Sequence, residues 1–184
     1  MLIFITGGVR SGKSTFAEKL AIEKAKNSPL HYIATSKRND IEMEERIMRH
    51  KQRRIESGVH WQTWEMEKGL ANLHTEIENN RVVLLDCLTT LLNNELFGLT
   101  EEGEFHFLGE KERKRLFDSL IGALHTLQLD RVLIVVSNEL FYDVPVKDET
   151  TFIYTAMLGM LHQKIVQLAD EAYVCENGIP IQMK

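Results

Sequence analysis

A glycine-rich segment near the start of the sequence constrains the fold more than any other feature. Residues 7–14 read GGVRSGKS and follow the apolar run LIFI, so they match the phosphate-binding loop pattern GxxxxGK[ST] in full. Glycines let backbone N–H groups turn toward phosphate oxygens, and the helix expected next adds its positive N-terminal end. A plain turn between strand and helix is the weaker alternative. We expect a nucleoside triphosphate to bind Gly7, Gly8, Val9, Arg10, Ser11, Gly12, Lys13 and Ser14.

The rest of the sequence alternates short apolar runs with longer helical patterns, which is typical of a parallel sheet covered by helices. Expected strands are 2–6, 30–34, 82–86, 131–137, 171–175 and 179–183, with a shorter candidate at 60–65. Expected helices are 13–26, 41–56, 68–79, 88–96, 110–127 and 151–169. Residues 98–109 are expected to form an irregular surface loop. We predict an α/β fold, a RecA-like P-loop NTPase with a mostly parallel sheet, in one domain over residues 1–184.

Composition excludes several other classes of protein. A chain of 184 residues can bury a core without disulfides or a structural metal. The net charge of −5 favours neither nucleic acid nor a membrane surface as the main partner. No run approaches the roughly 18 apolar residues of a membrane span, and no basic signal-peptide region precedes the first strand. Cys87 and Cys175 lie far apart and fit reduced thiols, so the cytoplasm is the expected compartment.

Polar residues follow several of the expected strands, where parallel-sheet proteins bind their ligands. They are Thr35 and Ser36, Asp86, and the segment 137–139. The apolar run before Asp86 is the pattern of a Walker B strand, whose carboxylate holds Mg²⁺ beside nucleotide phosphates. A helix cap is the alternative role for this residue. We predict that Ser14 and Asp86 bind the metal.

The expected helix 41–56 carries a histidine among cations. His50 is surrounded, within about two and a half helical turns, by Arg46, Arg49, Lys51, Arg53 and Arg54. Such a face is most often solvated, and a helical histidine is most often structural. The functional alternative is that the cations gather phosphates while a neutral imidazole attacks one of them. The resulting phosphoramidate would then be discharged by a second phosphate acceptor.

Taken together, these segments resemble the bifunctional adenosylcobinamide kinase / adenosylcobinamide-phosphate guanylyltransferase family. The likeness extends almost from end to end of the sequence. The GGxRSGKS form of the loop, combined with the histidine-bearing basic helix, is quite specific. The segments that carry it are ITGGVRSGKS (5–14), YIATS (32–36), EM, RI and HK within 42–51, HWQTWE (60–65), LLDCLTT (84–90), VSNE (136–139) and LADE (168–171).

The resemblance implies an enzyme with two activities. It would phosphorylate the aminopropanol hydroxyl of adenosylcobinamide with ATP or GTP. It would then transfer GMP from GTP to that phosphate through a guanylylated histidine, which maps onto His50, with Lys13 as the second catalytic residue. Mg²⁺ and a homo-oligomer are implied as well. Beyond the loop, the implied nucleotide contacts are Ala34, Thr35, Ser36, Lys51, Gln52, Arg53, Arg54, Glu65 and Asp86.

Three segments depart from the family pattern. Residues 51–60 replace a shorter link that contains Arg-Pro, and residues 140–145 replace a Gly-rich segment. Residues 154–157 and 162–163 replace an Arg-Asp pair and an Asn-Gln dipeptide. The last two changes fall where adenosylcobinamide or another small-molecule acceptor is expected to bind. Two alternatives therefore stay open: a P-loop small-molecule kinase without guanylyltransferase activity, and a non-catalytic nucleotide-dependent binding protein.

Overall fold

The computed structural model describes residues 1–26, 28–36, 41–99, 105–142 and 148–184. A seven-stranded sheet has the order β3-β2-β4-β7-β1-β8-β9. Neighbouring strands are parallel except for β8 and β9, which are antiparallel. The predicted α/β class with a mostly parallel sheet is therefore confirmed. The strands are β1 (Leu2–Gly7), β2 (Leu30–Ala34), β3 (Trp61–Glu65), β4 (Val82–Asp86), β7 (Val132–Val136), β8 (Glu171–Glu176) and β9 (Ile179–Gln182).

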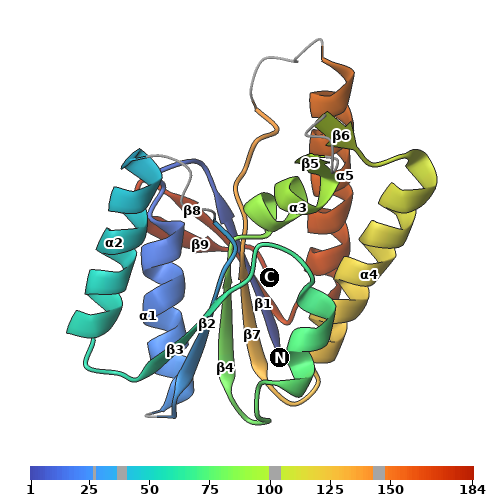
Figure 1. Cartoon of the computed structure of the whole chain (residues 1–184). Helices are drawn as coiled ribbons and strands as arrows, with labels where there is room; N and C mark the ends of the chain where they lie inside the picture. Colours follow the sequence, from blue (N-terminus) through green and yellow to red (C-terminus); the bar gives the residue numbers. More distant parts are fainter. Residues whose placement is uncertain (27, 37–40, 100–104, 143–147) are drawn as a thin grey trace.

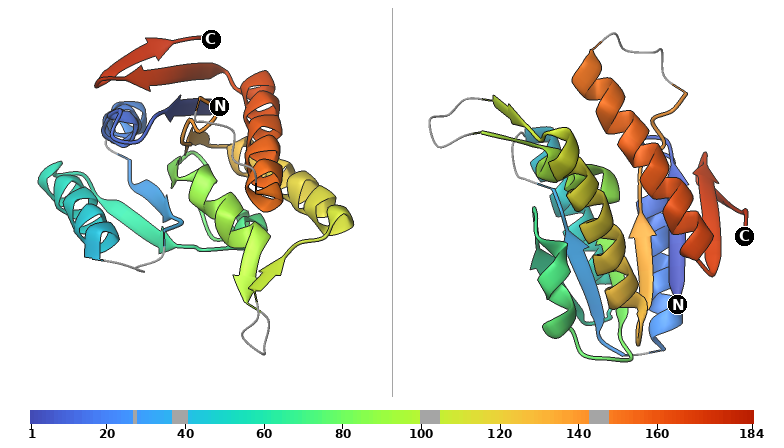
Figure 2. Two further views of the ribbon diagram at one scale, coloured as in Figure 1. Left: turned by 90° about the horizontal axis from the view of Figure 1, so that it is seen from above. Right: turned by 90° about the vertical axis from the view of Figure 1, so that its right-hand side faces the viewer.

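Helices cover both faces of the sheet (Figures 1 and 2). α1 (Lys13–Ala25) and α2 (Ile41–Glu56) lie on one side. α3 (Leu88–Leu96), α4 (Glu110–Gln128) and α5 (Glu149–Leu168) lie on the other. Because the central strands are covered on both faces, their side chains are buried without alternation, which explains their continuous apolar sequence.

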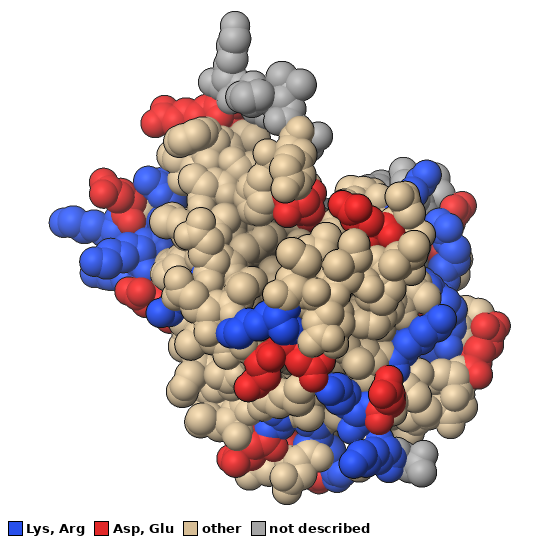
Figure 3. Space-filling model, turned by 180° about the vertical axis from the view of Figure 1, so that it is seen from behind, with Lys and Arg blue, Asp and Glu red and all other residues tan. Residues whose placement is uncertain are grey.

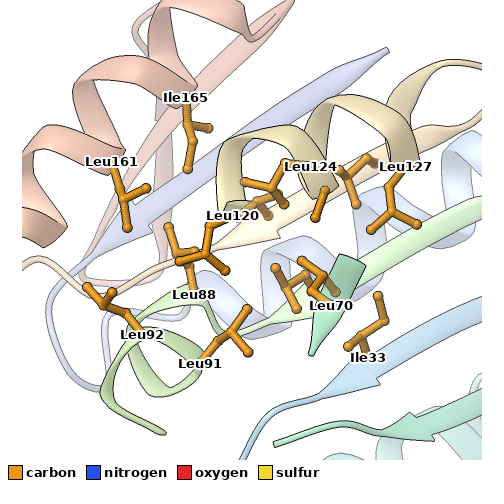
Figure 4. Close-up of a cluster of buried hydrophobic side chains, with 14 of the residues drawn as sticks. Ile33, Leu70, Leu88, Leu91, Leu92, Leu120, Leu124, Leu127, Leu161 and Ile165 are labelled. Carbon is orange, nitrogen blue, oxygen red and sulfur yellow. The ribbon is translucent and has the colours of Figure 1, made fainter. Parts of the chain in front are cut away.

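The larger part of the core lies between the sheet and α3, α4 and α5 (Figure 4). One face of α4 contributes to this core, since Leu120, Leu124 and Leu127 are all buried. Burial of each such leucine stabilises the fold by about 2 kcal/mol. On the opposite face, α1 presents small residues such as Ala17 and Ala21, so that helix packs close to the sheet.

The helix predicted at 68–79 is wrong in type and length. Only Leu70–Thr75 is helical, as the 3-10 helix η1, and it begins after Gly69 in a left-handed conformation with φ of 78°. The buried guanidinium of Arg131 donates to three carbonyl oxygens of this segment. These carbonyls belong to His74, Ile77 and Glu78. These hydrogen bonds hold the segment that follows η1 against Arg131.

The loop predicted at 98–109 is also partly wrong. Phe97–Leu99 (β5) and Phe105–Phe107 (β6) form a two-stranded antiparallel sheet. The rings of Phe97 and Phe107 stack with centroids 5.1 Å apart, and this cross-strand aromatic pair stabilises the ribbon. Residues 100–104 lie outside the described part of the chain. Elsewhere, predicted and observed element ends differ by one or two residues where they differ.

The helix lengths and the surface charges bear on what this protein can contact. Within the described ranges, no helix is both long enough and apolar enough to cross a membrane. Figure 3 shows the face behind that of Figure 1, where acidic and basic side chains are interspersed and neither sign dominates the described surface. Several of the cations that concern the site belong to α2.

Candidate active site

The predicted site segments follow the carboxyl ends of four neighbouring strands. Residues 7–14 follow β1, and Thr35 and Ser36 follow β2. Asp86 ends β4, and residues 137–139 follow β7. The prediction that all four segments lie at strand ends is confirmed. Because β1, β7, β4 and β2 are consecutive in the sheet, these segments share one edge of it.

The phosphate loop folds over its own lysine. Lys13 is only 3% exposed, and its Nζ donates to the Gly8 carbonyl oxygen at 3.0 Å. A Cβ atom at Gly7 would lie 2.4 Å from the Cys175 carbonyl oxygen, so only glycine fits there. Residues 9–15, together with residues 49, 50 and 53 of α2, line a cavity of about 230 Å³, which we call the phosphate pocket.

The back of the loop rests on the turn between β8 and β9. The Gly178 N–H donates to the Ser11 carbonyl oxygen at 2.9 Å. Gly12 has a left-handed φ of 90°, and a Cβ there would lie 3.0 Å from the Gly178 Cα. The hairpin turn therefore braces the loop from the side opposite the phosphate pocket.

A second cavity, of about 560 Å³, lies beside the phosphate pocket, and we call it the main cavity. Its walls come from β2, α2, β3 and the end of β4. His50 lines both cavities and thus stands where they adjoin. The predicted site residues on its walls are Ala34, Ser36, His50, Lys51, Arg54, Glu65 and Asp86.

A buried carboxylate on α1 organises the basic helix. Glu18 is 6% exposed, and its Oε1 lies 3.0 Å from His50 Nδ1 and 3.6 Å from Arg54 Nη1. Its Oε2 lies 4.0 Å from Arg53 Nε. The spacing i, i+3, i+4 brings these three α2 side chains to one face of the helix, which is the face turned toward α1. Arg53 also donates to the Thr15 hydroxyl, next to the phosphate loop.

Arg54 connects this cluster to Asp86 through an aromatic ring. The guanidinium carbon lies 3.8 Å from the centroid of the Tyr32 ring, whose hydroxyl donates to Asp86 Oδ2 at 3.0 Å. Burial and the neighbouring Asp86 charge raise the pKa of Tyr32 well above its usual value. The phenol therefore stays protonated and holds the Asp86 carboxylate in a fixed orientation at the main cavity.

Other predicted contact residues take different positions. Thr35 is fully buried, and its hydroxyl donates to the Cys87 carbonyl and accepts from the Cys87 N–H, both at 2.9 Å. Gln52 is exposed on the other side of α2 and donates to Glu56 at 2.8 Å. The structure does not bring Gln52 together with the other site residues. The side chains of residues 41–44 and 46, which include Arg46, lie outside the described part of the chain.

Sequence reasoning missed Glu18 and Tyr32. A signal for Glu18 existed, because it is a carboxylate in the middle of the small-residue stripe Ala17, Ala21 and Ala25 that α1 buries. Tyr32 carries no such signal, since it occupies an ordinary strand position and its partner Asp86 is 54 residues away.

The residues predicted for Mg²⁺ fit that ion chemically. The Ser14 hydroxyl and the Asp86 carboxylate are oxygen donors, and Mg²⁺ is usually held by one or two protein ligands together with substrate phosphates and water. Ser14 lines the phosphate pocket, and Asp86 lines the main cavity. Among the described residues, no group of three or more His, Cys, Asp or Glu side chains is placed to hold a metal alone. A cation here would share its coordination with the nucleotide.

A second histidine near the end of β7 has an apolar environment. His162 Nε2 lies 2.7 Å from Ser137 Oγ, which in turn lies 3.0 Å from Thr89 Oγ1. The rings of Phe4 and Phe141 pack edge-on against the imidazole. Desolvation lowers the pKa of His162 to about 4, so it is neutral at pH 7. This cluster anchors α5 to the strand end.

Comparison with known proteins agrees with the resemblance drawn from the motifs. A family model described as cobinamide kinase / cobinamide phosphate guanyltransferase (CobU) matches residues 3–183. The chain is 35% identical over 189 residues to the bifunctional adenosylcobalamin biosynthesis protein CobU of Escherichia coli (strain K12), and the match covers 100% of both. It is 36% identical to the bifunctional protein CobP of Pseudomonas aeruginosa, over 98% of this chain and 95% of the relative.

Solved structures are similar at the level of the fold. A prototypical ATPase from the type III secretion system of pathogenic bacteria superposes with a TM-score of 0.54 at 12% identity, over 98% of this chain and 56% of the ATPase chain. At that identity the likeness shows the fold alone, and it agrees with the P-loop NTPase class predicted from the sequence. The family model and the full-length relatives go further: the chain belongs to the CobU family of cobinamide kinases / cobinamide phosphate guanyltransferases.

Proposed function

We propose that this chain phosphorylates adenosylcobinamide with ATP or GTP and then transfers GMP from GTP to adenosylcobinamide phosphate, a step of cobalamin biosynthesis. The single observation that carries the proposal is the place of His50, which lines both the phosphate pocket and the main cavity. A nucleophile at that junction has access to a nucleotide on one side and to an acceptor on the other.

In the kinase step, the phosphate pocket holds the β- and γ-phosphates of the nucleotide. Backbone N–H groups of the loop and the Lys13 ammonium balance their charge, and Arg53 adds a guanidinium at the same pocket. Ser14 and Asp86 would hold Mg²⁺, which would supply further neutralisation of phosphate charge. The acceptor hydroxyl approaches from the main cavity and attacks the γ-phosphorus in line. The bond from that phosphorus to the β–γ bridging oxygen breaks, the nucleoside diphosphate leaves with the electron pair, and the hydroxyl proton passes to water.

In the guanylyl step, the imidazole of His50 attacks the α-phosphorus of GTP. A nitrogen–phosphorus bond forms, the bond from that phosphorus to the α–β bridging oxygen breaks, and pyrophosphate leaves with the electron pair. A phosphate oxygen of the acceptor then attacks the same phosphorus. The nitrogen–phosphorus bond breaks, its electron pair returns to the imidazole, and adenosylcobinamide-GDP is released.

The proposed function goes together with a domain organisation, an oligomeric state and a cellular compartment. Residues 1–184 act as one nucleotide-binding domain, and the family resemblance implies a homo-oligomer. Both cysteines are free thiols, which suits the reducing cytoplasm where nucleoside triphosphates are available. The names of the relatives refer to adenosylcobalamin biosynthesis, which favours adenosylcobinamide over another small-molecule acceptor.

The decisive experiment uses GTP labelled at the α-phosphorus. We expect the wild-type protein to acquire a label that is labile in acid and stable in base, which is the behaviour of a phosphoramidate. The label is absent in His50→Ala. It is retained in His125→Ala, which removes an exposed histidine of α4 as a matched control. Addition of adenosylcobinamide phosphate discharges the label into the product.

Two outcomes would favour the alternatives. A protein that transfers the γ-phosphate to adenosylcobinamide but acquires no α-label under saturating GTP and Mg²⁺ is a kinase only. A protein that binds GTP tightly but releases neither diphosphate nor pyrophosphate with adenosylcobinamide present is a nucleotide-dependent binding protein.

A further inference from the structure

We propose that Glu18 is a positioning residue for guanylyl transfer, which keeps a proton on His50 Nδ1 so that Nε2 presents its lone pair to the α-phosphorus. The inference deepens the function proposed above and rests on it. It assigns a role to a side chain outside the phosphate loop and outside the basic helix. It is carried by the burial of Glu18 and by the order of its contact distances.

The burial of Glu18 calls for a reason. An ionised carboxylate taken out of water costs several kcal/mol unless charged or hydrogen-bonding partners compensate. Glu18 is 6% exposed, whereas Glu23, on the same helix, is exposed to solvent. Within the described part of the chain, the charged partners of Glu18 come from α2. The closest is His50 Nδ1 at 3.0 Å, followed by Arg54 Nη1 at 3.6 Å and Arg53 Nε at 4.0 Å.

The short contact determines which nitrogen of the ring carries the proton. An ionised carboxylate can only accept hydrogen bonds, so a nitrogen 3.0 Å from Glu18 Oε1 must donate. An unprotonated Nδ1 would place two acceptors against each other. Arg53 Nη2 lies 3.4 Å from Nδ1 and, as a donor, would need Nδ1 to accept. The Glu18 contact is shorter by 0.4 Å, and the carboxylate has no proton of its own to give, so this contact decides the tautomer. In the neutral ring Nε2 is therefore the nitrogen with the free lone pair.

The same carboxylate acts on both halves of the transfer. When Nε2 bonds to phosphorus, the ring keeps its Nδ1 proton and becomes positively charged. The carboxylate of Glu18 then faces an imidazolium, which stabilises the intermediate and the transition state that leads to it. When the acceptor phosphate attacks, the electron pair returns to Nε2 and the ring is neutral again. No proton leaves Nδ1 in either step, so Glu18 needs to hold it and never to remove it.

The first experiment separates this role from a structural one. Glu18→Gln keeps the size of the side chain and removes its charge, while Glu23→Gln makes the same change at an exposed position of α1. In single turnovers with α-labelled GTP, we expect the rate of His50 labelling to fall by about 100-fold in Glu18→Gln, within the range found for groups that orient a histidine. The kinase rate falls by a much smaller factor. Glu23→Gln matches the wild type in both.

The second experiment reads the tautomer directly in the wild-type protein. With ¹⁵N-labelled histidines, long-range proton–nitrogen spectra distinguish protonated from unprotonated ring nitrogens, and the signals missing in His50→Ala identify that ring. At pH 8 we expect His50 to carry its proton on Nδ1 in the wild type and to become a mixture of tautomers in Glu18→Gln. This measurement does not require the variant to be active.

Each adverse result overturns the inference in its own way. A wild-type ring protonated at Nε2, alone or together with Nδ1, contradicts the assignment. Equal losses of labelling and kinase rates in Glu18→Gln point to a structural role, and an unchanged labelling rate shows that the charge is not needed. If the wild type acquires no label at all, the proposed function fails instead, and the tautomer of His50 still tests the contact with Glu18.

Discussion

His50 and His162 belong to polar clusters near the same end of the sheet, yet their surroundings differ in almost every respect. His50 faces a carboxylate at 3.0 Å, shares that carboxylate with the guanidinium groups of Arg53 and Arg54, and lines two cavities. His162 contacts a serine hydroxyl at 2.7 Å and packs between aromatic rings, and desolvation lowers its pKa to about 4. One ring is placed among charges at a cavity wall. The His162 ring is packed among aromatic side chains of the core.

We infer that His50 serves catalysis, whereas His162 contributes to the stability of the fold. A nucleophilic imidazole needs an accessible nitrogen and a partner that tolerates positive charge on the ring, and the α1–α2 interface supplies both. A structural imidazole needs only hydrogen-bond partners that remain neutral, which Ser137 supplies. The two histidines should therefore respond oppositely to the same substitution.

The largest expected effect comes from replacing each histidine by glutamine. His50→Gln should lower guanylyl transfer by about 10⁴-fold or more, because the nucleophile is lost. The glutamine amide can donate to the buried Glu18 in place of Nδ1, so the free energy of unfolding should change by less than about 1 kcal/mol. His162→Gln should lower the free energy of unfolding by about 3 kcal/mol through lost packing, while α-labelling of His50 persists. Urea unfolding and the labelling assay measure both. Equal effects on both properties would remove the distinction between the two clusters.

The next effect concerns the partner of His162. Ser137→Ala removes a hydroxyl that contacts both His162 Nε2 and Thr89 Oγ1, and leaves the ring nitrogen buried without that partner. We expect a loss of about 2 kcal/mol in the free energy of unfolding. Ser119→Ala, an exposed serine of α4, is the control and should be within about 0.5 kcal/mol of the wild type. A loss that small in Ser137→Ala would mean that the network contributes little.

The pH dependence of stability gives a third test. The pKa of His162 is about 4 in the folded chain, below its usual value of 6.5, because burial disfavours the charged ring. Between these values the unfolded chain binds more protons, so stability is complete above about pH 6.5 and is lost as the pH falls toward 4. From pH 7 to 5 the wild type should lose about 2 kcal/mol more than His162→Gln. Identical slopes for the two proteins would contradict a neutral buried ring.

The smallest expected effect is at the far end of the charged cluster. Tyr32→Phe removes the hydroxyl that donates to Asp86 Oδ2, so the carboxylate gains rotational freedom. We expect the Mg²⁺ concentration for half-maximal kinase rate to rise about fivefold, which corresponds to about 1 kcal/mol. Tyr142→Phe, at a side chain that is 94% exposed, should leave it unchanged. An unchanged Mg²⁺ requirement in Tyr32→Phe would exclude Asp86 orientation as a factor in metal use.

The parts of the site that could be predicted from the sequence are those formed by consecutive residues. The phosphate loop is one contiguous motif between a strand and a helix, and both flanking elements form where they were expected. Asp86 was placed correctly at a strand end because a continuous apolar run precedes it. In such cases the local sequence and the tertiary packing favour the same structure.

The parts that could not be predicted depend on side chains brought together from distant positions. Glu18 meets His50 only because α2 packs beside α1, and no local pattern specifies that packing. Carbonyl groups in the segment 68–79 accept hydrogen bonds from Arg131, which is more than 50 residues away in the sequence. Gln52 is different, because helical periodicity alone places it away from the face shared by His50, Arg53 and Arg54. The family motif implied nucleotide contacts for all four consecutive residues 51–54. On a helix, consecutive residues point in different directions, so the four side chains cannot all face the site.

The brace between Gly178 and Ser11 has a consequence for the order in which the site is completed during protein synthesis. Ser11 leaves the ribosome long before Gly178 does, but its carbonyl oxygen accepts the N–H of that later glycine. β1, which carries the loop, also lies between β7 and β8 and pairs with both. The support of the phosphate loop is therefore complete only after both β8 and β9 have been synthesised and have folded against β1.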